Sequence, residues 1–528
     1  MNKIKSSFAC SWLTRCVLYL VVVVGLASTS FAAQFDAPFM KAQQENKANW
    51  SKEDKALDKK LAALEKKFGK KPNIIFILTD DIGWGEVGWQ YGGKRRGTPT
   101  PELDQIAAEG MAFSSHYTEP TCTPTRLALL TGRHPVRTGV TQVLWPGGTH
   151  GLPKEEVTIA ELLSDVGYHT AMWGKWHIGD LDEHAPENQG FDYAYYTLYN
   201  AAFWMWSDVE AFYQQDDVSG NAHFYDYPGN EEYEKRYGIK IHGIMKGEKG
   251  KGRQQVSRVT RTSQMVDLED EYVKQIKAYI KDKAKTDKPF FIYWASNANS
   301  PAGSPQNVRF GEYVDHVNNN GVQMVQHSAD VAEVLQVLKN EGIEENTLVV
   351  WMSDNGPMYA FFPNSGYSWL RGGKGSVLEG GVRTPGFAWW KGMIEPGQDP
   401  LDMIHTVDMY TTAARIGGAI KKIPNERVTD GIDQTALFLN GEGHGRRHYM
   451  VHYSSANVGA VRIGDYKAVM GGGVGGGLPQ FETYNIVRDP GERYGAVYPY
   501  LWFIQPLNDL MRGHNALIQT FPHSTYKQ

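Results

Sequence analysis

The sequence predicts an α/β protein: a large mixed, mostly parallel sheet flanked by helices, with a smaller C-terminal α+β subdomain that contains an antiparallel sheet. Two continuous apolar runs, 73–79 and 347–353, have the composition of strands buried on both faces of a parallel sheet. Beyond residue 435 the pattern changes to short strand-like runs separated by Gly and Pro, which is typical of an antiparallel sheet. The length of 528 residues also exceeds one ordinary core.

The composition is that of a globular protein, with 41% hydrophobic and 21% charged residues and a net charge of −5. Nucleic-acid binding would call for a basic face, which this balance does not suggest, so we expect no nucleic-acid partner.

Residues 1–32 form a predicted secretory signal peptide. They have a basic start, an apolar stretch from Val17 to Leu26, and Ser30-Phe31-Ala32 as a small-x-small cleavage site. An uncleaved anchor is the alternative, but the apolar stretch is shorter than the roughly 20 residues that a membrane span needs. We therefore expect a periplasmic or secreted protein without a stable membrane anchor.

Residues 33–71 are predicted to be an N-terminal helical extension. Within it, 51–68 reads as an amphipathic helix capped by Ser51 and stopped by Gly69. Its apolar stripe consists of Leu57, Leu61, Leu64 and Phe68. The many Lys and Glu of this helix indicate a solvated face, so no chemistry is assigned to it.

The α/β domain is predicted to span 72–435, and its first strand, 73–79, ends in Asp80-Asp81. Two adjacent carboxylates at the end of a central strand lie at the edge where α/β proteins place their sites. Asp pairs also cap helices and fill turns, so the pair alone favours function only weakly. A helix with Pro101 at its first position then leads towards Cys122.

Cys122 is the only cysteine outside the leader, which holds Cys10 and Cys16. A lone thiol in an exported protein cannot form an internal disulfide. One interpretation is a buried Cys that acts as a small hydrophobe. However, the polar and turn-forming residues 123–126 and the apolar run after them place the Cys at a helix N-terminus, which favours an anion. We interpret Cys122 as a reactive position.

A second pair of polar residues follows another predicted strand. A capping box at Thr158 opens a helix, the strand 168–173 comes next, and Lys175 and His177 follow it. Residues two apart at a strand end point to the same side. Either could be a plain surface residue; in this place they fit a charge stabiliser and a proton acceptor.

The middle of the chain is less informative. The aromatic segment 191–212 fits a core or a pocket wall about equally well. Residues 204–262 are predicted to be a surface insertion, because most of that stretch is polar, Gly-rich and charged. Its basic run could contact an anionic substrate, an interpretation that we do not favour; the run comprises Lys246, Lys249, Lys251 and Arg253.

Predicted strands at 289–294 and 347–353 are separated by a helix over about 322–340. The second strand ends in Asp354-Asn355, so three carboxylates and an amide stand at the ends of two apolar strands. Hard oxygen ligands of this kind suit Ca²⁺ or Mg²⁺ and would not select zinc. Farther on, Lys374 lies between glycines and can approach a substrate closely, although its context is not a P-loop.

The C-terminal subdomain is predicted to span 436–528. Its strand-like runs are 449–453, 460–470 and 481–486, and a helix near the C-terminus closes the chain.

From about Lys71 to Pro490 the chain resembles the type I, formylglycine-dependent sulfatases and arylsulfatases of the alkaline-phosphatase superfamily. The motifs that carry this resemblance stand in the family's order: Asp80-Asp81, Cys122-Thr123-Pro124-Thr125-Arg126, Gly174-Lys175-Trp176-His177-Ile178-Gly179, Asp354-Asn355-Gly356, Arg371-Gly372-Gly373-Lys374-Gly375 and Val461-Arg462-Ile463-Gly464-Asp465-Tyr466-Lys467.

The resemblance implies that a formylglycine-generating enzyme oxidises Cys122 to 3-oxoalanine (formylglycine), whose hydrated aldehyde is the nucleophile. It also implies a bound cation, Ca²⁺ with Mg²⁺ less favoured. The implied metal ligands are the modified Cys122 together with Asp80, Asp81, Asp354 and Asn355.

The resemblance gives the remaining residues their tasks. Lys374 and Lys175 would stabilise the sulfate charge, with Lys374 near the leaving oxygen. Asp354 would help to deprotonate one hydroxyl of the hydrate and His177 the other, while Arg126 would orient the hydrate.

Two departures from the family pattern stand out. The family commonly has a His shortly after the strand that ends near Ala295, as the acid for the leaving group, whereas Ser300 aligns there. Either Lys374 acts alone, or His316 or His327 contributes, or the preferred leaving group needs little protonation. In addition, Thr125 stands where the modifying enzyme usually meets Ser or Ala.

The sequence therefore predicts an exported sulfatase that hydrolyses aryl or carbohydrate sulfate monoesters. The alternatives are a phosphate or phosphonate monoester hydrolase of the same superfamily and a non-catalytic relative that binds sulfated glycans.

Overall fold

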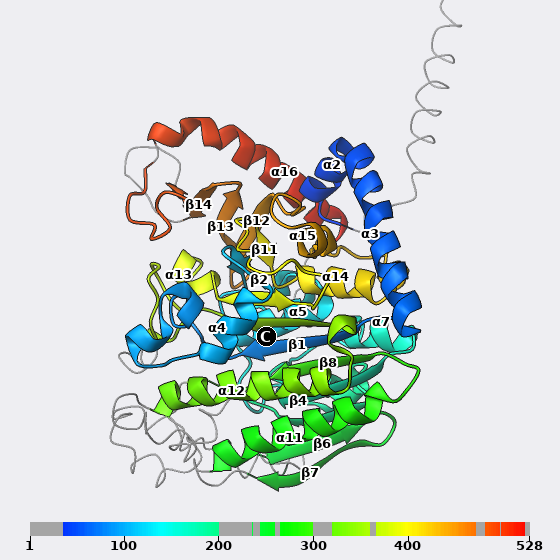
Figure 1. The fold of residues 1–528 in the computed structure, drawn as a ribbon. Helices are drawn as coiled ribbons and strands as arrows, with labels where there is room; N and C mark the ends of the chain where they lie inside the picture. Colours follow the sequence, from blue (N-terminus) through cyan, green and yellow to red (C-terminus); the bar gives the residue numbers. More distant parts are fainter. Residues whose placement is uncertain are drawn as a thin grey trace, which may run out of the picture.

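The computed structural model describes residues 35–199, 235, 243–258, 264–298, 319–359, 366–470, 481–496 and 498–522. Its main feature is a nine-stranded mixed sheet in the order β2-β10-β9-β1-β8-β4-β5-β6-β7 (Figure 1). The five strands from β9 to β5 are parallel, and the edge strands run antiparallel to their neighbours. The bounds are β1 Asn73–Thr79, β2 Met111–Ala112, β4 His169–Lys175, β5 Tyr193–Thr197, β6 Gly243–Glu248, β7 Gly252–Arg258, β8 Phe290–Ala295, β9 Thr347–Ser353 and β10 Gly386–Trp389.

The predicted parallel core is confirmed. Every residue of β1, β8 and β9 is buried, as expected for strands covered on both faces. The register pairs Thr79 with Ser353, so the chain leaves β1 and β9 side by side at the same edge of the sheet. This edge is where Asp80, Asp81 and Asp354 follow the strands.

Two groups of helices cover the sheet. In one layer, α12 (Asn319–Asn340) contacts both α4 (Pro101–Ala108) and α11 (Gln264–Ala284). A second group of contacting helices comprises α5 (Cys122–Thr131), α7 (Ile159–Asp165) and α14 (Asp408–Ile416). The predicted capping box of α7 is present, because Thr158 accepts from the Glu161 amide and Glu161 from the Thr158 amide.

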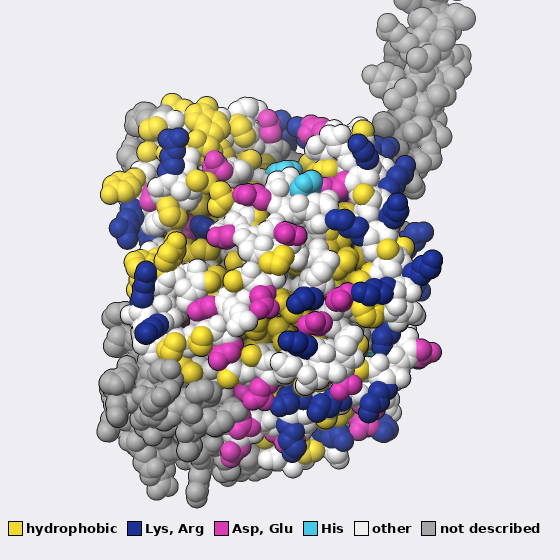
Figure 2. All heavy atoms as spheres, viewed as in Figure 1, with side chains coloured by type: hydrophobic (Ala, Val, Ile, Leu, Met, Phe, Trp, Pro, Cys, Tyr) yellow, Lys and Arg dark blue, Asp and Glu magenta, His cyan; other side chains and the backbone are white. Residues whose placement is uncertain are grey.

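The N-terminal helix is longer than predicted. Helix α3 spans Lys47–Phe68 and follows α2 (Ala37–Glu45) directly through Asn46. The predicted cap at Ser51 is therefore wrong: α3 begins at Lys47, so Ser51 lies inside the helix. The predicted apolar stripe is confirmed, and α3 ends at Gly69 with φ +71°. Figure 2 shows basic side chains in a column along the edge where Figure 1 places α3.

Part of the predicted surface insertion belongs to the main sheet. Residues 243–258 form the β6–β7 hairpin that ends it, with Ile244 and Met245 buried. The prediction was wrong here because an edge strand tolerates charge on its open side. The basic run is partly paired within the protein, since Lys246 lies 3.2 Å from Glu248 and Arg253 lies 2.9 Å from Asp182. The rest of 204–262, apart from Lys235, lies outside the described residues.

The C-terminal subdomain contains the predicted antiparallel sheet and closing helix. Its strands are β12 (Tyr449–Ser454), β13 (Asn457–Ile463), β14 (Tyr466–Met470) and β15 (Phe481–Asn485), and α16 spans Ile504–Thr520. The run 460–470 is two strands joined at Gly464, whose φ of +54° turns the chain. Helix α2 packs against α16, so the N-terminal extension joins this subdomain.

A buried ion cluster connects the C-terminal sheet to the main domain. The Lys467 ammonium on β14 lies 2.9 Å from the Glu379 carboxylate and 3.0 Å from Glu492, and all three side chains are fully buried. Glu379 opens α13 (Glu379–Val382) and also accepts a hydrogen bond of 2.6 Å from the Tyr117 hydroxyl. Charges buried to this degree must remain paired.

Within the described residues, no helix combines the length and the apolar character that crossing a bilayer requires.

Candidate active site

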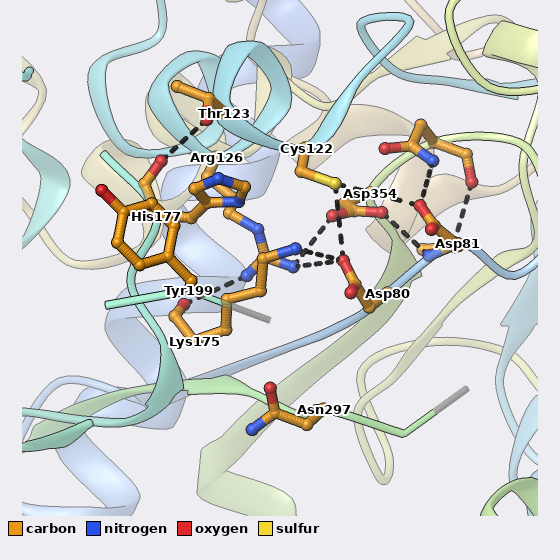
Figure 3. Close-up of polar contacts among 12 residues, drawn as sticks. Asp80, Asp81, Cys122, Thr123, Arg126, Lys175, His177, Tyr199, Asn297 and Asp354 are labelled. Carbon is orange, nitrogen blue, oxygen red and sulfur yellow. Dashed lines mark hydrogen bonds and ion pairs between the residues drawn. The ribbon is translucent and has the colours of Figure 1, made fainter. Parts of the chain in front are cut away.

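Three carboxylates and a thiol meet at the carboxyl edge of the sheet. Ligand atoms of Asp80, Asp81, Cys122 and Asp354 all lie within 4.8 Å of one another, and all four residues are buried (Figure 3). Asp80 and Asp81 directly follow β1, Asp354 directly follows β9, and Cys122 is the first residue of α5. We call this group the acidic cluster.

The backbone adopts an unusual conformation directly after β1. Asp81 has a φ of +60°, a left-handed conformation that a residue with a Cβ rarely adopts. Its amide donates to the Asp354 carboxylate over 3.1 Å, which connects the ends of β1 and β9. Strain of this kind persists only where surrounding contacts enforce it.

Three cations neutralise the acidic cluster from different elements. Lys175, at the end of β4, donates to Asp80 over 2.6 Å. Arg126 on α5 donates to Asp80 over 3.2 Å and to Asp354 over 2.8 Å. Lys374 contacts both carboxylate oxygens of Asp81, at 2.7 and 2.8 Å. The structure thus brings these three predicted site residues together on the acidic cluster.

The cations set the charge states of the carboxylates. Burial alone would raise the pKa of Asp80, but Lys175 and Arg126 hold it well below its usual range. Burial and the nearby Asp80 charge raise the pKa of Asp354 to about 7. The site therefore holds two neighbouring carboxyl groups of very different acidity.

Cys122 is the first residue of α5, as the sequence predicts, and its side chain points towards the carboxylates of the acidic cluster. Its sulfur lies 3.6 Å from an Asp80 oxygen and 3.9 Å from an Asp81 oxygen. Burial, and next the Asp354 charge, raise the thiol pKa. The unmodified side chain is therefore a thiol and not the thiolate that would act as a nucleophile.

The oxygen donors fit a hard divalent cation. The second oxygen of Asp80 and the side-chain oxygen of Asn355 are buried and have no hydrogen-bond partner among the described residues. Asn355 is fixed by donating to Asp81 over 2.6 Å. Converging carboxylates with such unsatisfied oxygens match the ligands of Ca²⁺ or Mg²⁺.

His177 lies beside the cationic side chains of the site, and like Asp81 it has a φ of +60°. Burial, and then Lys175 and Arg126, lower its pKa well below the usual value, so the imidazole is neutral. Its Nε2 lies 3.1 Å from the Leu144 carbonyl oxygen.

Two residues that the sequence did not single out hold His177. The Thr123 hydroxyl donates to the His177 carbonyl over 2.9 Å and accepts from the Leu144 amide over 3.1 Å. The Tyr199 ring meets the imidazole edge-on at 5.3 Å. Tyr199 belongs to the aromatic segment, where a pocket wall was one of the two interpretations, whereas Thr123 gave no signal beyond its place in the motif.

One candidate for the leaving-group acid is excluded. His327 on α12 is bound through both ring nitrogens, to the Trp351 indole at 2.9 Å and to the Ser296 hydroxyl at 3.3 Å. Burial lowers its pKa to about 3, so it is a neutral core residue. Ser300 and His316 lie outside the described residues.

A cavity of about 250 Å³ is not lined by the acidic cluster itself, but its wall includes sequence neighbours of two site residues. Thr121 and Gly375 contribute to its wall, and they adjoin Cys122 and Lys374 in sequence. The Gly375 amide donates to the Pro120 carbonyl over 2.8 Å, which joins these two parts of the wall. The remaining lining residues come from 119–124, 135, 141–145 and the β12–β13 turn at 453–455.

The comparisons with known proteins agree with this geometry. A family model described as Sulfatase matches residues 72–419. The chain is 32% identical to N-acetylgalactosamine-6-sulfatase of Canis lupus familiaris over 422 residues, covering 75% of this chain and 71% of that protein. It is 34% identical to arylsulfatase A of Homo sapiens over 410 residues, covering 76% and 75%.

A solved structure shares the fold as well as the sequence. The PsFucS1 sulfatase from Pseudoalteromonas sp. superposes with a TM-score of 0.81 at 32% identity, covering 90% of this chain and 95% of that one. Together with the family match, these similarities place the chain in the sulfatase family, the sulfuric ester hydrolases.

Proposed function

We propose that this sulfatase is exported and uses a formylglycine made from Cys122, together with a divalent cation, to hydrolyse sulfate monoesters. The observation that carries the proposal is the position of Cys122 against Asp80 and Asp81, inside a set of oxygen ligands and fixed cations. At this position, the oxygen of a formylglycine made from Cys122 could bind the same metal ion as the Asp80 and Asp81 carboxylates.

The residues that would hold the cation are the modified Cys122, Asp80, Asp81, Asp354 and Asn355, and Ca²⁺ fits them better than Zn²⁺. When bound, the cation supplies a Lewis acid that polarises a sulfate oxygen and lowers the pKa of a coordinated hydroxyl. The modified Cys122 supplies that hydroxyl.

The protein's own side chains then bind the anion and move protons. Lys175 and Lys374 carry the positive charge that a sulfate group requires, and Gly375, the sequence neighbour of Lys374, lines the cavity where the alcohol part would lie. Arg126 fixes Asp80 and Asp354 relative to α5. Asp354 assists deprotonation of one hydroxyl and neutral His177 accepts the proton of the other.

The alcohol part of the substrate is proposed to be a sugar or an aryl group held in the adjoining cavity. A volume of about 250 Å³ lies below the ~300–1,000 Å³ of pockets that bury a drug-sized ligand, so it has room for about one ring. The name of the N-acetylgalactosamine-6-sulfatase relative supports a sugar, and that of arylsulfatase A supports an aryl group.

Two measurements test the proposal together. Mass spectrometry of the peptide that contains residue 122, after co-expression with a formylglycine-generating enzyme, is expected to show aldehyde in place of thiol. The same preparation is assayed with aryl sulfates, carbohydrate sulfates and aryl phosphates. We expect kcat/KM to be higher for sulfates and to vanish in Cys122→Ala.

Full activity with unmodified thiol throughout would refute the formylglycine part of the proposal. Higher kcat/KM for phosphates would favour the phosphate ester hydrolase, and retained sugar binding without turnover would favour the glycan-binding alternative.

Export is supported by the leader of residues 1–32. N-terminal sequencing of the protein from cell fractions tests it, with a mature start after Ala32 expected in the periplasm or medium.

A further inference from the structure

Two segments beside the active site expose aromatic side chains. Tyr91 is 70% exposed, Tyr359 52% and Trp369 54%. We call these three residues the aromatic ledge. Large apolar side chains left in water at one place mark interaction sites more often than single exposed residues do.

The ledge adjoins the point where the active site reaches solvent. The Lys374 side chain is 16% exposed, whereas those of Asp81, Asp80, Arg126, Lys175 and Asp354 are at most 2% exposed. The Tyr359 ring lies against Gly373, the neighbour of Lys374, and its hydroxyl donates to the Gly372 carbonyl over 2.5 Å.

The Trp369 indole packs against the backbone of Gly85. Gly85 lies in the segment after β1 that also carries Asp80 and Asp81. A Cβ at Gly85 would come within 1.9 Å of the indole, so glycine is what lets the ring lie on the backbone. The carbonyl of Gly85 in turn lies close to Gly92, next to Tyr91. Tyr359 and Trp369 thus lie against the two segments that carry Lys374 and Asp81, and Tyr91 lies farther along the segment after Asp81.

The two nearer rings are held in place before any ligand arrives. The Trp369 amide donates to the Trp84 carbonyl over 3.4 Å, and the Tyr367 ring meets the indole edge-on at 5.6 Å. Tyr367 is itself covered by the Arg96 guanidinium at 3.7 Å. Fixed rings lose little conformational entropy on binding, which favours a binding surface.

The surroundings of the ledge are strongly basic. Segments 91–97 and 366–375 contain five basic residues and no acidic one, in a chain whose net charge is −5. They are Lys94, Arg95, Arg96, Arg371 and Lys374. Lys94, Arg95 and Arg371 are exposed, and Arg371 is oriented by the Tyr484 hydroxyl at 3.1 Å. A local field of this sign attracts an anion.

We propose that the aromatic ledge binds a sulfated polysaccharide through sugar units beyond the one whose ester is cleaved. The proposal rests on the proposed function for the location of the cleaved ester. Sugar rings present an apolar C–H face that an exposed aromatic ring can cover, and the flanking cations pair with sulfate groups along the chain.

Binding of dextran sulfate, dextran and carboxymethyl dextran, measured by calorimetry without turnover, tests the proposal. We expect wild type to prefer dextran sulfate, and Tyr359→Ala/Trp369→Ala to bind it about tenfold or more weakly. Trp502→Ala is the matched control, because Trp502 is also 54% exposed but lies in the C-terminal part of the chain. Trp369→Phe keeps an aromatic face and should retain most of the affinity.

Two further readouts keep the test decisive. kcat/KM for nitrophenyl sulfate should stay within about twofold in the ledge variants, since a small substrate does not reach the ledge. Lys94→Ala/Arg95→Ala, which alters exposed side chains only, should weaken dextran sulfate binding and flatten its salt dependence.

Equal affinities of the ledge variant and Trp502→Ala would overturn the proposal, as would equal wild-type binding of carboxymethyl dextran, which would indicate anion binding alone. A protein that hydrolyses no sulfate ester would refute the proposed function and leave these binding results unaffected.

Discussion

At the scale of single residues, Lys374 differs from the other described cations of the site because it both pairs with Asp81 and is partly exposed. It donates to both oxygens of Asp81 and is also partly exposed, and its sequence neighbour Gly375 belongs to the cavity wall. Because His327 is bound within the core, we propose Lys374 as the acid that protonates the leaving oxygen.

Lys374→Ala should therefore lower kcat/KM much more for a carbohydrate or alkyl sulfate than for nitrophenyl sulfate. Alkoxides need a proton to depart and nitrophenolate does not, and general acid catalysis contributes about 10²–10⁴-fold. Steady-state kinetics on both substrates measure the difference. A uniform loss would mean that Lys374 only binds sulfate and that another residue protonates the leaving oxygen.

Thr123→Val should lower kcat roughly 10–100-fold, because the hydroxyl that joins His177 to the 144 loop is lost and a small displacement of a catalytic group is costly. KM should change less. The matched control is Thr131→Val on the same helix, whose hydroxyl, among the described residues, donates only to the Leu127 carbonyl. Equal losses in the two variants would show that Thr123 merely supports α5.

At the scale of elements, the C-terminal sheet is connected to the main domain by Lys467. This buried ammonium faces Glu379 on α13, and α13 adjoins the site because the Gly356 amide donates to the Gly381 carbonyl over 2.9 Å. A change in β14 can therefore reach the segment that carries Asn355.

Lys467→Met should lower the free energy of unfolding by about 3–5 kcal/mol, because it removes the buried cation that Glu379 and Glu492 share. Adding Glu379→Gln should restore part of the loss. Urea unfolding of both variants and wild type measures this. If the single and double variants were equally unstable, the charge pairing would not be the cause.

The same interaction has a pH signature. Although burial alone would raise it, Lys467 and Arg383 lower the pKa of Glu379 to about 2, from an ordinary value of 4.5. A depressed carboxyl pKa contributes stability that is complete above the ordinary value and lost as the pH falls from about 4.5 towards 2. Lys467→Met should lose much of this pH dependence, which urea unfolding at pH 3 and pH 6 would detect.

At the scale of the whole molecule, the acidic cluster joins β1, β9 and α5, which lie far apart in the sequence. Exhaustive chelation should abolish activity, and Ca²⁺ or Mg²⁺ should restore it better than Zn²⁺. The melting temperature should fall in parallel, because an ion that binds only the folded state stabilises it by about 2.7 kcal/mol at a hundredfold excess over Kd. Full activity in verified metal-free protein would refute the cation.

The sequence predicts those features of the structure that depend on one continuous segment, and it does not predict side-chain contacts between segments that are far apart in the chain. The apolar runs of β1 and β9 determine where Asp80 and Asp354 emerge, so their proximity could be predicted. The pairing of Lys175 with Asp80 and of Lys374 with Asp81 could not, since it depends on how separate segments pack. For the same reason the β6–β7 edge hairpin escaped prediction: its charges resemble those of a loop until a neighbouring strand pairs with it.

The complete burial of Cys122 has a consequence for biosynthesis. An enzyme that modifies this side chain has to meet it before the fold closes, and closure requires β9, about 230 residues later in the chain. Translation at ~5–20 residues per second leaves an interval of about 10–50 s. If Cys122 is modified as proposed, the yield of active protein should depend on the rate of synthesis as well as on the sequence.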